Sequence, residues 1–247
     1  MDSTLIELYD QAYIPYQSHR LNLELRERVE RESRGLLQLV DEIKNKFLGD
    51  RDWSELHVAE LGGGMGGLSL HLARRGAQVT VVDCSKTALD IHRQLAQMSH
   101  LETEQVCLDV THPEANLSKK FDLLIDSHLL HCIARPAERA SYLSFVREHL
   151  TPTGFFVGES MVHRKKMFIP PGYRLDEDNI LWQKFSDWIP LRKITDSLLL
   201  EDEFKNSGFF INYFFYYANF AFAVNQDFLE LPGDILPASV RFALRLP

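Results

Sequence analysis

The feature that most constrains the fold is a run of glycines at a strand-to-helix turn. Residues 56–61 are typical of a short strand, Gly62 to Gly67 follow directly, and residues 68–75 have a helical pattern closed by Gly76. Glycine lets the backbone adopt positive φ and lets a ligand approach closely. The run therefore predicts a ligand-binding turn after the first strand of an α/β sheet, with a turn that binds nothing as the alternative.

Strand and helix patterns alternate along the chain beyond this turn. The pattern predicts strands at 78–83, 104–108, 121–125 and 155–159, and helices at about 85–98 and 136–150. A charged helical segment at roughly 21–47 comes before the first strand. Such alternation indicates a parallel sheet with helices on both faces.

The part of the chain after residue 160 departs from this alternation. Residues 161–196 look like an insertion with a short helix of its own, and a further helix is expected at about 198–206. The aromatic segments 209–217 and 220–224 predict an antiparallel hairpin. We divide the chain into 1–50, an N-terminal lid segment and helix; 51–228, a ligand-binding domain that includes 161–196 as a substrate lid; and 229–247, a C-terminal tail.

The glycine run fits two known spacings. Gly62, Gly64 and Gly67 fit the GxGxxG of dinucleotide-binding folds, whereas Glu60 with Gly62, Gly64 and Gly66 fits (D/E)xGxGxG. Glu60 discriminates between them, because a carboxylate at this strand end repels a pyrophosphate and suits a cationic amino group. The second spacing is therefore favoured.

On these residues, the segment from about 56 to 224 resembles the class I S-adenosylmethionine-dependent methyltransferases. The resemblance implies a Rossmann-like, seven-stranded, mostly parallel sheet that ends in a C-terminal antiparallel hairpin, and S-adenosylmethionine as cofactor. It implies that Glu60 faces the amino group of the methionyl moiety, that Asp83 accepts from the ribose hydroxyls, and that Cys84 packs on the adenine edge. It also implies adenine contacts from Asp109 and the backbone of Val110, and places the backbone of Asp126 at the methionyl moiety.

Two histidines follow the fourth predicted strand, near the expected position of the sulfonium methyl group. His128 and His131 are candidates for a base that deprotonates the methyl acceptor, since the pKa of a histidine is close to neutrality. Packing or capping of the following turn is the alternative for each. The resemblance thus predicts methyl transfer to an oxygen, nitrogen or carbon nucleophile of a small molecule.

Departures from related families narrow this prediction. Residues 159–161 lack the Asp-Asn pair of magnesium-dependent catechol-type enzymes, so we expect no catalytic metal. Residues 126–129 are not Asn-Pro-Pro-Tyr, which disfavours methylation of exocyclic base amines. An aminopropyltransferase of the spermidine synthase type, whose glycine run is similar, and a non-catalytic subunit that binds S-adenosylmethionine remain as alternatives.

Composition limits the partners and the compartment. The formal net charge is −8, with 27 Lys and Arg against 35 Asp and Glu, whereas a nucleic-acid-binding protein normally has a basic excess. The three cysteines are widely spaced and form no CxxC, which fits the reducing cytoplasm. We expect no secretory signal, no membrane span, no nucleic-acid partner, and a monomer or homodimer.

Overall fold

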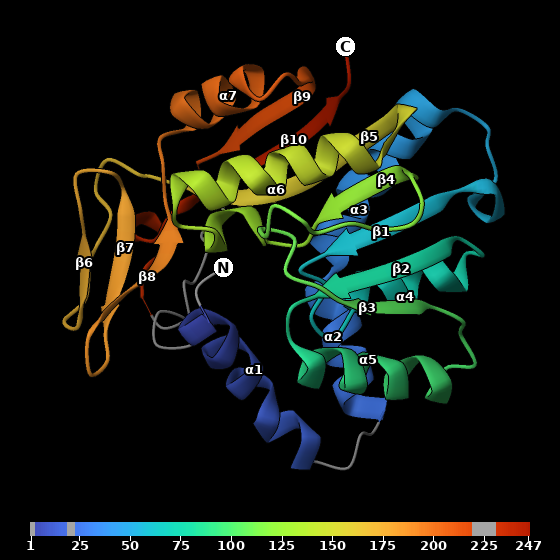
Figure 1. Cartoon of the computed structure of the whole chain (residues 1–247), viewed down its shortest axis with the longest axis horizontal. Helices are drawn as coiled ribbons and strands as arrows, with labels where there is room; N and C mark the ends of the chain where they lie inside the picture. Colours follow the sequence, from blue (N-terminus) through green and yellow to red (C-terminus); the bar gives the residue numbers. More distant parts are fainter. Residues whose placement is uncertain (1–2, 19–22, 219–230) are drawn as a thin grey trace.

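The chain folds around a seven-stranded sheet, with a small second sheet beside it (Figure 1). The computed structural model describes residues 3–18, 23–218 and 231–247. The strands of the large sheet, in spatial order, are β3 (Glu104–Cys107), β2 (Gln78–Asp83), β1 (His57–Leu61), β4 (Phe121–Asp126), β5 (Leu150–Val162), β10 (Ala238–Arg245) and β9 (Phe210–Tyr217). The first five are parallel and β10 is antiparallel to both neighbours, which confirms the predicted fold class.

Helices cover both faces of this sheet, because successive strand residues point to opposite sides. On one face α3 (Arg34–Ile43), α4 (Gly67–Arg74) and α5 (Lys86–Met98) pack on Val58 and its neighbours. On the other face α6 (Pro136–His149) and α7 (Ser197–Asn206) pack on Ala59 and Leu61. In Figure 1 α6 lies in front of the sheet and α3 behind it. The carboxyl ends of the parallel strands are left open between these layers.

The antiparallel pair at the C-terminal end of the chain is built differently from the prediction. The partner of β9 is β10, from the segment 229–247 that we had set apart as a tail, and the second predicted strand, 220–224, lies outside the described residues. β10 is buried between β5 and β9. The sequence did not indicate β10, because the aromatic run 209–224 carries a stronger strand signal than Ala238–Arg245, whose role depends on tertiary pairing.

The N-terminal segment, for which we expect a lid segment and one helix at roughly 21–47, forms several helices. The lid segment is itself a helix, α1 (Ser3–Ser18), and α2 (Leu23–Glu32) is separate from α3. η1 (Lys44–Leu48) extends α3 as a π-helical turn. α1 packs against α5, where Tyr13 and Tyr16 contact the apolar cluster that includes Leu70 and Ile91.

The insertion at 161–196 is a second sheet, and the short helix predicted there is wrong. β6 (Tyr173–Leu175), β7 (Ile180–Lys184) and β8 (Trp188–Lys193) form an antiparallel sheet in that order. Its core contains Leu181 and Ile194, which pack with Met161 and Leu236. The aromatic and β-branched residues of this segment favour strands over a helix.

Among the described residues, no helix has both the length and the apolar character needed to cross a membrane.

Candidate functional site

A cavity of about 350 Å³ opens at the carboxyl ends of β1, β2, β3 and β4. It is bounded by the strand ends on one side and by α1 and β8 on the other. The lining residues are Tyr9, Tyr13, Gly62, Val82, Asp83, Cys84, Leu108, Asp109, Val110, Thr111, Ser127, His128, Leu129, His131, Cys132, Met161 and Arg192. Ligands of open α/β sheets bind at this edge, so the cavity is the candidate site.

The glycine turn is closely packed on its protein side. Gly62, Gly64 and Gly66 have φ values of 67°, 53° and 70°, which glycine adopts without strain. A Cβ atom on Gly62 would lie 2.8 Å from Cβ of Leu129, and one on Gly66 would lie 2.1 Å from Nδ1 of His92. Of the three, only Gly62 lines the cavity. Gly64 lies against the hydroxyl of Tyr13 from α1, which would be 2.5 Å from such a Cβ atom.

Glu60 lies beneath the turn and does not line the cavity. Its buried carboxylate accepts from the backbone N–H of Ser69 at 3.0 Å and from the Ser69 hydroxyl, in the first turn of α4. Burial raises the pKa of Glu60 despite these hydrogen bonds. The carboxylate therefore fixes the start of α4, where the helix dipole favours negative charge.

Two aspartates from neighbouring strand ends face the cavity. Asp83 accepts from the backbone N–H of Gly64 and of Ser85, both at 2.8 Å, so it connects the glycine turn to the start of α5. Burial raises the pKa of Asp83. Asp109 accepts from the N–H and the hydroxyl of Thr111 at 2.9 and 2.7 Å. With Cys84 and Val110 beside them, these aspartates form one polar end of the cavity.

Asp126 ends β4 and turns its carboxylate into the protein, away from the cavity. It accepts from the backbone N–H groups of Leu129 and Leu130 at 3.0 and 2.9 Å and from the Tyr142 hydroxyl at 2.7 Å. Burial raises the pKa of Asp126 to about 6. Its side chain thus shapes the loop that carries the two histidines.

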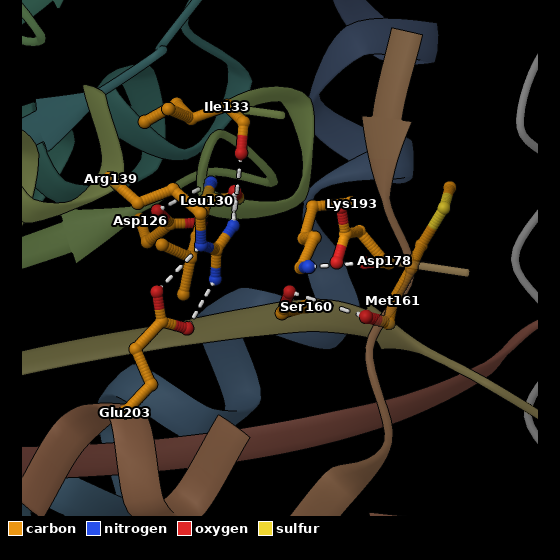
Figure 2. A network of polar contacts seen from close by, with 9 residues as sticks. All are labelled: Asp126, Leu130, Ile133, Arg139, Ser160, Met161, Asp178, Lys193 and Glu203. Carbon is orange, nitrogen blue, oxygen red and sulfur yellow. Dashed lines mark hydrogen bonds and ion pairs between the residues drawn. The ribbon is translucent and has the colours of Figure 1, made fainter. Parts of the chain in front are cut away.

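A second polar network, which sequence reasoning missed, holds the same loop from below (Figure 2). The Arg139 guanidinium donates to the carbonyls of Leu130 and Ile133 at 2.5 and 3.1 Å. It also donates to both carboxylate oxygens of Glu203 on α7, at 2.7 and 2.6 Å. Arg139 and Glu203 are 64 residues apart, so nothing in the local pattern indicates the pair. The loop after β4 is therefore fixed at several backbone atoms.

His131 is buried in the cavity wall and held in one tautomer. Its Nδ1 accepts from the backbone N–H of Met161 at 3.3 Å, so the neutral ring carries its proton on Nε2. Burial, together with the charges of Arg192, His128 and Arg139, lowers the pKa of His131 well below its usual value. This arrangement makes His131 a neutral hydrogen-bond donor.

His128 has a carboxylate partner. Its Nε2 lies 3.6 Å from Oε2 of Glu159 on β5, and its backbone φ of 65° places it in a left-handed conformation. Glu159 also accepts from Ser239 and Arg241 at 2.8 and 3.0 Å. Burial acts to raise the pKa of Glu159, but His128 and Arg241 lower it overall. Sequence reasoning missed this role of Glu159, since Ser239 and Arg241 are contributed by the unassigned C-terminal segment.

α1 and β8 meet over the cavity. Nη1 of Arg192 donates to the Tyr9 hydroxyl at 2.5 Å, and both residues line the cavity. Tyr9 and Tyr13 of the N-terminal lid segment thus reach the cavity, while the other aromatic candidates of the two lid segments, Tyr16, Trp182 and Trp188, do not line it. The described residues hold no group of three or more His, Cys, Asp or Glu side chains placed to hold a metal ion.

Residues 59–156 match a family described as a methyltransferase domain, and no curated protein matches the chain by sequence. Solved structures with a similar fold include an S-adenosylmethionine-dependent methyltransferase from Clostridium acetobutylicum, at 15% identity over 85% of this chain and 98% of that one, with a TM-score of 0.57. The PH0226 protein from Pyrococcus horikoshii is 20% identical over 87% and 92%, with a TM-score of 0.62. The glycopeptide N-methyltransferase MtfA, complexed with S-adenosylmethionine, is 18% identical over 85% and 87%, with a TM-score of 0.56.

Proposed function

We propose that the chain, whose residues 59–156 match a methyltransferase-domain family, is a class I S-adenosylmethionine-dependent methyltransferase that methylates an oxygen, nitrogen or carbon nucleophile of a small molecule. The observation that carries the proposal is the pairing of His128 with Glu159 in the wall of the cavity that Asp83 and Asp109 also face. The volume of the cavity, about 350 Å³, and its position beneath α1 and β8 favour a small acceptor.

The polar end of the cavity fits the cofactor. We assign Asp83 to the ribose hydroxyls, because a carboxylate offers two acceptor oxygens, and Asp109 and Val110 to the adenine, with Cys84 at its edge. Gly62, at the turn, lines the same cavity. Gly64, Gly66, Glu60 and the side chain of Asp126 act behind this surface, by holding the turn and the loop after β4. Bound there, the cofactor supplies an electrophilic methyl group on a sulfonium.

His128 and His131 have different roles in this proposal. We assign to His128, whose Nε2 lies 3.6 Å from the Glu159 carboxylate, the proton that the acceptor loses when its nucleophilic atom takes the methyl group. His131, which carries its proton on Nε2, donates a hydrogen bond and orients the acceptor. Alignment and exclusion of water supply much of the remaining rate. We retain, as predictions, a cytoplasmic location and a monomer or homodimer.

Titration calorimetry with S-adenosylhomocysteine tests the cofactor assignment. Asp83→Ala should weaken binding by about 10- to 100-fold, which corresponds to roughly 1–3 kcal/mol for a charge-assisted hydrogen bond. NAD should bind much more weakly than S-adenosylhomocysteine to the unaltered protein. Wild-type affinity in Asp83→Ala would show that the ribose assignment is wrong, and micromolar NAD binding without S-adenosylhomocysteine binding would overturn the proposed function.

Formation of S-adenosylhomocysteine from S-adenosylmethionine, measured over a panel of small acceptors, tests the catalytic assignment. His128→Gln should lower turnover of an oxygen or nitrogen acceptor by about 10²- to 10⁴-fold, with little change in cofactor affinity. The exposed His112→Gln is the matched control and should keep wild-type turnover. If His128→Gln turns over acidic and weakly acidic acceptors at the wild-type rate, and this remains so when the pH is raised, then His128 is not the base.

A further inference from the structure

In the cavity wall, the guanidinium of Arg192 has no counter-ion among the residues that the structure describes. Nη1 of Arg192 donates to the Tyr9 hydroxyl at 2.5 Å and to the carbonyl of Leu191 at 2.9 Å, which are both uncharged groups. Nε is covered by protein atoms and has no hydrogen-bond partner, and Nη2 donates to no described residue. No Asp or Glu in the described part of the chain forms an ion pair with Arg192.

The groups packed around Arg192 do not neutralise it. Burial raises the pKa of the Tyr9 hydroxyl and of the Cys132 thiol, so both are uncharged at neutral pH. His131 is a neutral ring, as its contact with the backbone N–H of Met161 requires. Lys193, the next residue on β8, donates to the carbonyl of Asp178 (Figure 2), and successive strand residues point to opposite faces.

An unpaired cation is unfavourable at such a position. Buried charges in proteins are normally paired, and an unpartnered buried donor in a native structure calls for an explanation. Arginine is well suited to binding carboxylates, because its donors match the two oxygens of that group. Since Arg192 lines the cavity, the missing partner is best explained as a group of the ligand.

We propose that Arg192 binds a carboxylate of the methyl acceptor, so that the substrates of this enzyme are small carboxylic acids. This inference rests on the proposed function and adds the substrate class. Two placements favour the acceptor over the cofactor as the source of the carboxylate. Arg192 belongs to β8, outside residues 59–156, and β8 contacts the loop after β4, where the charge of Arg192 acts on His131 and Cys132. The carboxylates assigned to the cofactor, Asp83 and Asp109, follow β2 and β3 instead.

The test measures binding to protein saturated with S-adenosylhomocysteine. The probes are hydroxy- and amino-substituted benzoates, phenylacetates and cinnamates, each compared with its own primary amide by titration calorimetry. We expect at least one acid to bind tenfold or more tightly than its amide. Arg192→Gln should remove that preference and weaken the acid by at least tenfold, while the affinity for S-adenosylhomocysteine stays within threefold of wild type.

Two further variants separate charge from structure. Arg192→Lys keeps the charge and should retain part of the preference for the acid. Tyr9→Phe removes the hydrogen-bond partner but leaves the guanidinium, and should keep the preference. A Tyr9→Phe variant that loses it as completely as Arg192→Gln would show that Arg192 only positions α1, and would overturn the proposal. Melting curves of all three variants show whether a loss of acid binding is caused by unfolding of the variant.

The remaining outcomes also decide the question. No preference for any acid in the wild-type protein overturns the inference. A tenfold loss of S-adenosylhomocysteine affinity in Arg192→Gln, with the acid unaffected, assigns the carboxylate to the cofactor and equally overturns it. Both results leave the proposed function standing if S-adenosylhomocysteine binds and acceptors are methylated. Only a failure of the wild-type protein to bind S-adenosylhomocysteine contradicts the proposed function itself.

Discussion

Two regions of the molecule face the same cavity and are built in opposite ways. The strand ends of the large sheet hold their polar groups by short-range contacts, such as Asp109 with Thr111 and Asp83 with Ser85. The region that covers the cavity, formed by α1 and β6–β8 and called the cover here, is held by contacts between distant segments. Tyr9 and Arg192, which connect its two parts, are 183 residues apart. The end of the cavity that we assign to the cofactor is therefore largely set by local sequence, and the end that we assign to the acceptor by tertiary packing.

The largest difference between the two regions should come from matched glycine substitutions. Gly66 and Gly172 both have positive φ, 70° and 83°. A Cβ atom on Gly66 would lie 2.1 Å from the buried His92 ring, whereas nothing lies within 4 Å of one on Gly172, next to β6. Gly66→Ala should abolish S-adenosylhomocysteine binding and lower the free energy of unfolding by more than about 3 kcal/mol, since steric overlap adds to backbone strain.

Gly172→Ala is the control for strain alone. It should cost about 1–2 kcal/mol of stability and leave cofactor affinity unchanged, as measured by urea denaturation and calorimetry. Equal losses of affinity in the two variants would contradict the division into a cofactor end and a cover.

The same division explains what sequence alone predicted. The glycine run and the strand ends after 61, 83 and 109 are local patterns, and the structure places Gly62, Asp83, Cys84, Asp109 and Val110 together around one cavity. Glu60 belongs to the glycine motif that we identified from the sequence, but its carboxylate accepts a hydrogen bond from Ser69, nine residues along the chain. Arg139, Glu159 and Arg192 were missed because each has its role through a partner 64 to 183 residues away. Neither charge pattern nor periodicity carries such information.

Acid should weaken the cofactor end through a buried histidine. His92 of α5 contacts the carbonyl of Met65 in the glycine turn through Nδ1, at 3.1 Å, and the hydroxyl of Thr103 through Nε2, at 2.9 Å. Burial lowers the pKa of His92 to about 4. Below its ordinary pKa of 6.5, His92 takes up a proton in the unfolded chain but stays neutral in the folded protein. The free energy of unfolding should therefore fall as the pH decreases from about 6.5 to 4, by up to roughly 3 kcal/mol.

Urea denaturation of His92→Gln at pH 7.0 and 5.0 measures this contribution, because all other titrating groups cancel in the difference from wild type. The stability advantage of the wild-type protein should shrink at pH 5.0. Ser33→Ala is the control: it removes one hydrogen bond, from the Ser33 hydroxyl to the carbonyl of Val29, that involves no titrating group, so its offset should stay constant. A His92→Gln difference that is the same at both pH values would show that His92 does not limit stability in acid.

The smallest expected effect on stability concerns α1, one of the two parts of the cover. Asp10 of α1 accepts from the hydroxyl of Ser85 at 2.7 Å and from the N–H and hydroxyl of Thr87 at 3.0 and 2.9 Å, at the start of α5. These contacts hold Tyr9 and Tyr13 over the cavity. Asp10→Ala should cost about 1 kcal/mol of stability, the usual scale for such contacts. We expect α1 to move when the cofactor product leaves, so the dissociation rate of S-adenosylhomocysteine should rise several-fold in Asp10→Ala, as measured by stopped-flow tryptophan fluorescence.

Asp52→Ala is the matched control for that experiment. Asp52 caps the short turn η2 (Trp53–Glu55) by accepting from the backbone N–H of Ser54 at 2.9 Å, before β1 and outside the cavity lining. Its loss should cost a similar amount of stability, since it is also an aspartate that caps a helical turn, but it should leave the dissociation rate unchanged. If Asp10→Ala releases the product no faster than Asp52→Ala, then α1 is part of the wall rather than a lid. Access to the cavity would then have to be controlled by β6–β8, the other half of the cover.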